Sequence, residues 1–322
     1  MKKLKEILFL KNIKGVGKAA IYAKFWNALQ VSTNIDGLMK MVAKESSFSD
    51  DLIQEARSKA EKIYAEISDD LDIHIVTIFD EEYPDKLHIM GNKKPLILYI
   101  KGNMDVLKME NISVIGTRKP SEWSVVVEKR LVKKILALSN RVIVSGLALG
   151  CDKIAHETTV NEKRITAAIM PCGVNVIAPV KHKKLAEDIL VTGGCLISEY
   201  EPNVKAFKQN FIERDAIVAA FSDITLVVEC NEKSGAMHTV KYAYEYKRPI
   251  GCYYPDDIGK GSYGGNEYMV NNLNAFRILG TEELKKLLSI RADFSAYSSE
   301  RKEPVQLLLS DFISEVDEDY GV

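Results

Sequence analysis

The sequence predicts an α/β fold in which a Rossmann-like domain with a mostly parallel sheet follows a small helical domain. Between residues 111 and 253, short runs of Val, Ile and Leu alternate with longer segments of helical periodicity. Such apolar runs are typical of parallel strands covered by helices on both faces. Before residue 69 the apolar spacing is helical. We therefore expect a helical domain over 1–68, the Rossmann-like domain over 69–290 and an acidic tail over 291–322.

The composition is typical of a cytoplasmic globular protein. The 322 residues leave room for two or three domains, and 46% hydrophobic with 28% charged residues is ordinary. No apolar run approaches the roughly 18 residues of a membrane span, and no cleavage-type site follows the basic start, so we expect neither export nor membrane contact. The formal net charge of −1 does not exclude a nucleic-acid partner, because acidic residues gather after Arg291 and only the distribution of charge decides.

The five cysteines are widely spaced and show no metal-ligand pattern. This predicts reduced, buried thiols, with no disulfide framework and no metal site. They are Cys151, Cys172, Cys195, Cys230 and Cys252.

A Gly-x-Gly turn lies near the start of the chain. Ile13 precedes Gly15-Val16-Gly17, after which Ile21, Phe25 and Leu29 recur at helical spacing. The pattern resembles a helix-hairpin-helix element, whose hairpin amides and neighbouring lysines bind a phosphate without reading sequence. A small helical bundle that uses the glycines only to turn explains the pattern equally well.

The remaining elements follow from apolar runs and turn residues. Strands are expected at 73–78, within 94–102, and at 112–115, 142–144, 165–170, 195–199, 224–229 and 249–253. Helices are expected over 121–139 and from about 152, 181, 210 and 234. A helix over 266–273, a strand at 275–279 and a helix after Thr281 close the domain. Beyond residue 291 we expect a linker and a marginal helix, with Glu315 to Tyr320 disordered.

The stretch from Val142 to His156 organises the expected site. A β-branched run ends in a turn that contains Gly146 and Gly150, and a helix with Asp152 at its N-cap follows. Glycine allows positive φ and close approach, while the first amides of a helix lack partners and face an anion that the helix dipole favours. The loop predicts a phosphate cradle, although any strand-to-helix turn can carry two glycines.

Other loops also follow predicted strands. In parallel sheets the ligand crevice lies beyond the carboxyl ends of the strands, so we expect these loops to meet at one rim. Arg118 and Lys119 there suit a phosphate, or else form a solvated surface pair. Lys208 and Phe211, one turn apart, combine a phosphate contact with a stacking face, or else Phe211 belongs to the core. His156 shares a helix face with Asp152, and no nucleophile accompanies them, so we expect them to shape the loop.

Several motifs stand in one order along the chain. They are Gly116-Thr117-Arg118, Ser145 to His156, Ser198-Glu199-Tyr200, Asn210-Phe211-Ile212-Glu213-Arg214, and Val227-Val228-Glu229 with Ser234-Gly235. This order resembles the DprA/Smf family of DNA-processing proteins, whose Rossmann-like domain carries a Gly-Ser/Thr-Arg turn, an SGLALGxDxxAH signature, and SEY, NF-x-x-R and VVE…SG segments. The resemblance covers roughly residues 70–280.

The resemblance implies a single-stranded DNA-binding protein that protects incoming DNA and loads a RecA-type recombinase onto it. It also implies a homodimer without catalysis or cofactor, and a variable helical domain at the N-terminus. Residues 266–273 correspond to the dimer and recombinase surface of the family, with core packing as the alternative.

This chain departs from the family pattern at three places. Glu213-Arg214-Asp215-Ala216 replaces a basic Arg-Asn-Arg run, so the positive pocket should be weaker. Tyr253 to Asp257 replaces a Pro-Gly turn, and the tail does not resemble a winged-helix domain.

We thus expect a nucleic-acid site without catalytic or metal-binding residues. Its contacts are Gly116, Thr117, Arg118, Lys119, Ser145, Gly146, Lys208, Phe211, Arg214, Ser234 and Gly235, with Gly150, Asp152, His156 and Glu229 shaping the loops. The rival hypothesis is a nucleotide sensor on the same fold, which needs only a phosphate cradle. A related phosphoribohydrolase needs a Pro-Gly-Gly-x-Gly-Thr loop, and Lys233 to His238 does not supply it.

Overall fold

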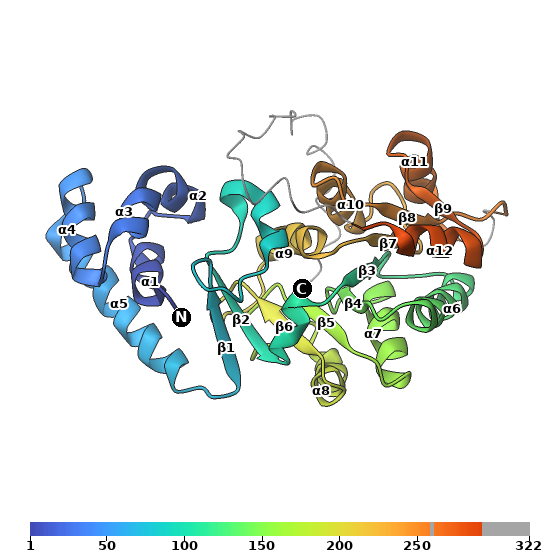
Figure 1. The fold of residues 1–322 in the computed structure, drawn as a ribbon, viewed down its shortest axis with the longest axis horizontal. Coiled ribbons are helices and arrows are strands. Elements are labelled where there is room, and N and C mark those ends of the chain that lie inside the picture. Colours follow the sequence, from blue (N-terminus) through green and yellow to red (C-terminus); the bar gives the residue numbers. More distant parts are fainter. Residues whose placement is uncertain (258–260, 292–322) are drawn as a thin grey trace.

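The computed structural model describes residues 1–257 and 261–291. Within them, one nine-stranded sheet has the order β1-β2-β6-β5-β4-β3-β7-β8-β9 (Figure 1). The predicted α/β class is therefore confirmed. The expected linker and helix beyond residue 291 and the expected disorder at Glu315 to Tyr320 lie outside the described residues. The strands are β1 (Ile73–Thr77), β2 (Ile97–Gly102), β3 (Asn111–Ile115), β4 (Val142–Ser145), β5 (Thr166–Ile169), β6 (Cys195–Ser198), β7 (Thr225–Val227), β8 (Ile250–Tyr253) and β9 (Phe276–Ile278).

In the spatial order from β6 to β9 all strands are parallel, whereas β2 runs the opposite way. β2 pairs antiparallel with both β1 and β6. The remaining neighbours are parallel. The carboxyl ends of β3 to β8 therefore share one edge, at which the loops singled out in the sequence emerge.

Helices cover both faces of the sheet. On one face, Ile112 and Val114 of β3 pack in a cluster with Leu131 of α6 and Leu287 of α12, and α9 and α10 cover the opposite face (Figure 1). The near-complete burial of both faces accounts for the unbroken apolar runs in the sequence. The helices of this region are α6 (Glu122–Leu138), α7 (Cys151–Asn161), α8 (Lys183–Val191), α9 (Lys208–Phe221), α10 (Ala236–Glu245), α11 (Gly264–Asn272) and α12 (Thr281–Ser289), with 3-10 turns at Asp85–Lys93, Met104–Lys108 and Val180–His182.

The N-terminal region is a bundle of helices. Its core contains Ile21, Phe25 and Leu29, the residues that recur at helical spacing in the sequence. Side-chain caps start two of its helices, because Asn34 accepts a hydrogen bond from Gly37 N and Ser49 accepts one from Leu52 N. The helices are α1 (Leu4–Asn12), α2 (Lys18–Ala20), α3 (Trp26–Val31), α4 (Ile35–Glu45) and α5 (Asp50–Ser68), with a π-helical turn at Ile21–Phe25.

Ion pairs join this bundle to the loop that follows β6. Lys18 Nζ lies 2.5 Å from Glu199 Oε2, and Lys11 Nζ lies 2.6 Å from Glu201 Oε1. Trp26 also stacks on Phe79, with ring centroids 5.4 Å apart. One of the lysines beside the Gly-x-Gly turn is thus committed to a contact within the protein.

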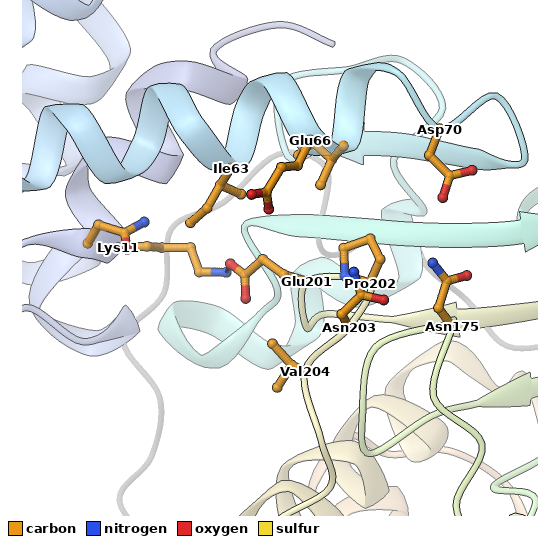
Figure 2. Close-up of a pocket in the computed structure, with 11 residues that line it drawn as sticks. Lys11, Ile63, Glu66, Asp70, Asn175, Glu201, Pro202, Asn203 and Val204 are labelled. Atoms are coloured by element: carbon orange, nitrogen blue, oxygen red, sulfur yellow. Dashed lines mark hydrogen bonds and ion pairs between the residues drawn. The ribbon is translucent and has the colours of Figure 1, made fainter.

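A cavity of about 470 Å³ lies beside the Lys11–Glu201 pair. Figure 2 shows Lys11 and Glu201 pointing toward one another below α5, with Pro202, Asn203 and Val204 lining the opposite wall. The segment after β6 therefore forms part of the contact between the helical bundle and the sheet.

No helix in the described part of the chain is both long and apolar enough to cross a membrane. All five cysteines are buried and unbridged.

Candidate nucleic-acid interface

A cavity of about 610 Å³ lies at the carboxyl edge of the sheet. The loops after β3, β4 and β7 and the first turns of α9 surround it. Convergence of these loops follows from the parallel strands, whose carboxyl ends meet at one edge. The expected site residues among its walls are Gly116, Thr117, Arg118, Lys119, Gly146, Asp152, Phe211, Arg214, Glu229, Ser234 and Gly235.

Two glycines are needed here because other groups occupy the space of a Cβ atom. A Cβ on Gly146 would overlap the Arg214 guanidinium, and one on Gly116 would lie 2.5 Å from Cys151 Sγ. The expected positive φ is found at Gly150, where φ is 73°. The φ of Gly146 is not positive, and the neighbouring positive φ, of 58°, belongs to Leu147. Gly146 thus serves close approach to Arg214.

Asp152 is not the N-cap that the sequence suggested. Gly150 is the N-cap of α7, and Asp152 Oδ2 accepts hydrogen bonds from Gly146 N at 3.0 Å and Ala148 N at 3.2 Å. Cys151 N donates to Thr117 O. We expected unpaired amides in this loop, facing an anion. This prediction is wrong for the amides of Gly146, Ala148 and Cys151, which all have partners within the protein. The carboxylate folds back because it satisfies two loop donors at once.

Glu229 connects the loop that contains Ser121 with the loop that contains Ser262, at one side of the cavity. Its Oε2 accepts from Ser121 N and from Ser121 Oγ, both at 2.8 Å, and its Oε1 accepts from Ser262 N at 2.8 Å. Ser121 is also the N-cap of α6. The Glu229 carboxylate therefore fixes the loop that carries Arg118 and Lys119.

Two guanidinium groups lie close to the Phe211 ring. Arg118 Cζ lies 5.6 Å from the ring centroid, and Arg214 Cζ lies 5.9 Å from it. Arg118 is half-buried and Lys119 is exposed. The two residues thus offer a planar fork and a point charge at the cavity wall.

Arg214 is a poorer candidate for DNA contact than the sequence implied. It is only 4% exposed, and its Nη1 donates to Gly146 O and to Ile169 O. Its Nε lies 3.0 Å from Asp215 Oδ1. Since the guanidinium holds two backbone carbonyls and a carboxylate, we reassign Arg214 from a DNA contact to a support of the cavity wall.

Asp215 is a cavity residue that the expected set omitted. Burial raises its pKa to about 6, while Arg214 opposes that shift. The sequence offered a signal, since Asp215 stands in the segment where the family has a basic run. A buried carboxyl beside the cations makes the local charge depend on pH near neutrality.

Gly150 and three other expected residues are not among the cavity walls, and the positions of these three have clear reasons. Ser145 is fully buried and donates to Val114 O, so it does not reach a ligand. His156 is buried with Nδ1 2.7 Å from Thr166 Oγ1, and burial lowers its pKa to about 3, so it ties α7 to β5 instead of shaping the loop. Lys208 is exposed on the first turn of α9 and is not part of the walls.

Ser234 and Gly235 line the wall where α10 begins. Ser234 Oγ accepts from Ala236 N at 3.4 Å, and Gly235 is the N-cap of α10. Gly235 has φ −55°, so its backbone does not require glycine.

In the segment expected as a dimer surface, two residues face inward. Asn266 bonds Val228 O, Tyr253 O and Cys230 N, and Met269 is fully buried. The core-packing alternative therefore holds for these two positions.

The sequence model of the family described as DNA recombination-mediator protein A matches residues 74–289. The chain belongs to this family. Among curated relatives of this mediator family, Protein Smf of Escherichia coli strain K12 is 30% identical over 211 residues, covering 66% of this chain and 55% of that protein. The DNA processing protein DprA of Streptococcus pneumoniae strain R6 is 33% identical over 175 residues, covering 54% of this chain and 60% of that protein. The matches thus span little more than half the length of these relatives.

Solved structures of the mediator family share this fold. The X-ray structure of DprA from Streptococcus pneumoniae superposes with a TM-score of 0.71 at 24% identity, covering 88% of this chain and 97% of that chain. DprA from Helicobacter pylori, a structure described with its single-stranded DNA binding mode, has a TM-score of 0.58 at 26% identity, covering 68% of this chain and 96% of that chain.

Proposed function

We propose that this chain binds single-stranded DNA, irrespective of sequence, at the cavity that Arg118, Lys119 and Phe211 line. The observation that supports this most is that the carboxylates of the cavity are bonded to groups of the protein. Each cavity carboxylate is engaged inside the protein, since Asp152 and Glu229 accept from backbone amides and Asp215 pairs with Arg214. Arg118 and Lys119 lie on the loop that Glu229 holds, which suits a phosphate.

Sequence independence follows from the kind of contact available. Phosphate contacts position a strand without reading its bases, and an aromatic ring stacks on any base. The cavity offers few cations, so the affinity should depend moderately on salt. With two phosphates contacted, the slope of log K against log salt should be about −1.4, at about −0.7 for each phosphate on a single strand.

We infer a homodimer that protects the strand and loads a RecA-type recombinase onto it, which is supported by membership in the mediator family. A recombinase filament-assembly assay on single strands, with and without this protein, tests the loading step. Assembly that is no faster with the protein present would contradict it.

The experiment that tests binding compares an oligothymidylate with mononucleotides. Fluorescence anisotropy of a labelled strand gives the affinity, and a thermal-shift series with nucleoside monophosphates gives the rival outcome. Tight binding of one mononucleotide with no binding of the strand would favour the nucleotide-sensor hypothesis, which a cavity of about 610 Å³ also accommodates.

A further inference from the structure

One segment joins the two cavities of the protein. Pro202, Asn203 and Val204 line the cavity beside the helical bundle, and Phe211 lines the proposed DNA site. Between them the chain runs as Lys205-Ala206-Phe207-Lys208 into the start of α9. A strand leaving the DNA site along α9 toward the bundle would pass over this stretch.

Phe207 is an unusual residue for its position. It is 62% exposed, although a Phe side chain is normally mostly buried in a globular protein. It is also the N-cap of α9, where Ser, Thr, Asp or Asn would cap the helix, and it makes no side-chain cap. Neither core packing nor helix capping therefore accounts for an aromatic ring here.

The flanking charges favour a polyanion. Lys205 and Lys208 are both exposed, one on each side of the ring. Two carboxylates of this region are engaged within the protein, since Glu201 pairs with Lys11 and Glu213 accepts from Tyr200 Oη at 2.7 Å. The cores of protein interfaces are depleted in lysine, so an aromatic ring flanked by two lysines fits DNA better than a protein partner.

We propose that Phe207 is a second stacking surface for single-stranded DNA, outside the cavity, with Lys205 and Lys208 contacting phosphates on either side of the stacked base. The inference rests on the proposed function and extends its site along the chain. Stacking on an aromatic ring tolerates any base, which is consistent with sequence-independent binding. Lys208, which does not line the cavity, thereby gains a role as part of this outer contact.

The test measures affinity against strand length. Oligothymidylates from about 4 to about 16 nucleotides are titrated into the parent chain and the variants Phe207→Ala and Phe207→Trp. Phe207→Ala should weaken binding of the longer strands about tenfold and leave the shortest strand, held in the cavity alone, unchanged. Phe207→Trp should keep the parent affinity, and its added fluorescence should be quenched by the strand, after subtraction of the signal from Trp26 and Trp123. Val191→Ala, at an 84% exposed apolar residue of α8, is the matched control and should change nothing.

The outcomes separate this inference from the proposed function. If Arg118→Ala weakens every length while Phe207→Ala weakens none, the cavity binds DNA and the second stacking surface does not exist. A Phe207→Ala variant with altered mass in sedimentation, and a Phe207→Trp variant without quenching, would show that the ring contacts protein and would overturn the inference. Failure of both Arg118→Ala and Phe207→Ala to change affinity would refute the proposed function itself.

Discussion

Replacing Arg118 by alanine tests the proposed interface at the residue best placed to hold a phosphate. The half-buried guanidinium lies 5.6 Å from the centre of the Phe211 ring, on a loop that Glu229 holds through Ser121. The carboxylates of the cavity have partners that Arg118→Ala leaves in place, since Asp215 pairs with Arg214, Asp152 accepts from Gly146 N and Glu229 accepts from Ser121 N. The change should therefore act on the ligand more than on the fold.

The expected magnitude follows from one lost contact. A hydrogen bond to a charged group contributes about 1.5–3 kcal/mol, and partial exposure of Arg118 to solvent places the loss near the lower end. A loss of about 1.4 kcal/mol corresponds to about tenfold weaker binding. Removing one phosphate contact should also reduce the salt slope by about 0.7.

Fluorescence anisotropy with labelled oligothymidylate and a mixed-sequence strand, over a range of salt concentrations, measures both quantities. Arg130→Ala is the matched control, because Arg130 is an exposed arginine on α6 outside the cavity walls. Arg118→Lys should give an intermediate affinity, since lysine keeps the charge and loses the planar fork. The proposed site is wrong if Arg118→Ala binds both strands as the parent does at low salt with an unchanged slope.

Three further predictions follow from the cavity and its surroundings. Gly146→Ala should lower the free energy of unfolding by about 2 kcal/mol, because the new Cβ displaces the Arg214 guanidinium from its carbonyl partners. Gly17→Ala is the control and should change that free energy little, because the space around Gly17 is open. Equal free energies for the two variants in denaturant unfolding would contradict this reasoning. DNA affinity should rise as the pH falls through about 6, because protonation of Asp215 removes a negative charge beside Arg118 and Arg214, and Asp215→Asn should flatten the profile; parallel profiles at constant ionic strength would exclude Asp215 as the cause. Burial raises the pKa of Glu128 in the folded protein. Between the unfolded pKa of about 4.3 and this raised pKa, Glu128 is ionised only in the unfolded chain, so the free energy of unfolding falls as the pH rises. Glu128→Gln should therefore raise the unfolding temperature more at pH of about 8 than at pH of about 5, and an equal rise at both would contradict the burial argument.

Local patterns were sufficient to predict the fold and the convergence of the loops at one cavity. Runs such as Val142 to Val144 indicated strands because both of their faces are buried, and the parallel order of those strands brought Gly116, Gly146 and Gly235 to one cavity. These inferences need only periodicity and the rule for where loops emerge from a parallel sheet.

The side-chain roles could not be predicted in the same way. Ser145 and His156 stand in the signature segment, yet both are buried and bonded to neighbouring strands. Arg214 reaches Gly146 across 68 positions of the sequence, and Lys18 reaches Glu199 across 181. Such pairings depend on three-dimensional proximity that no local pattern encodes.

The ion pairs between the helical bundle and the β6 loop are less exposed to solvent than the cations of the proposed DNA site. Glu199 is 9% exposed and Lys18 is 28% exposed, whereas Lys119 lies at the surface. Dissolved salt screens exposed charges strongly and sheltered pairs much less. As the ionic strength rises, we therefore expect a bound strand to dissociate at salt concentrations that leave the ion pairs between the bundle and the β6 loop intact. The arrangement of the helical bundle and the sheet should thus be the same with and without DNA.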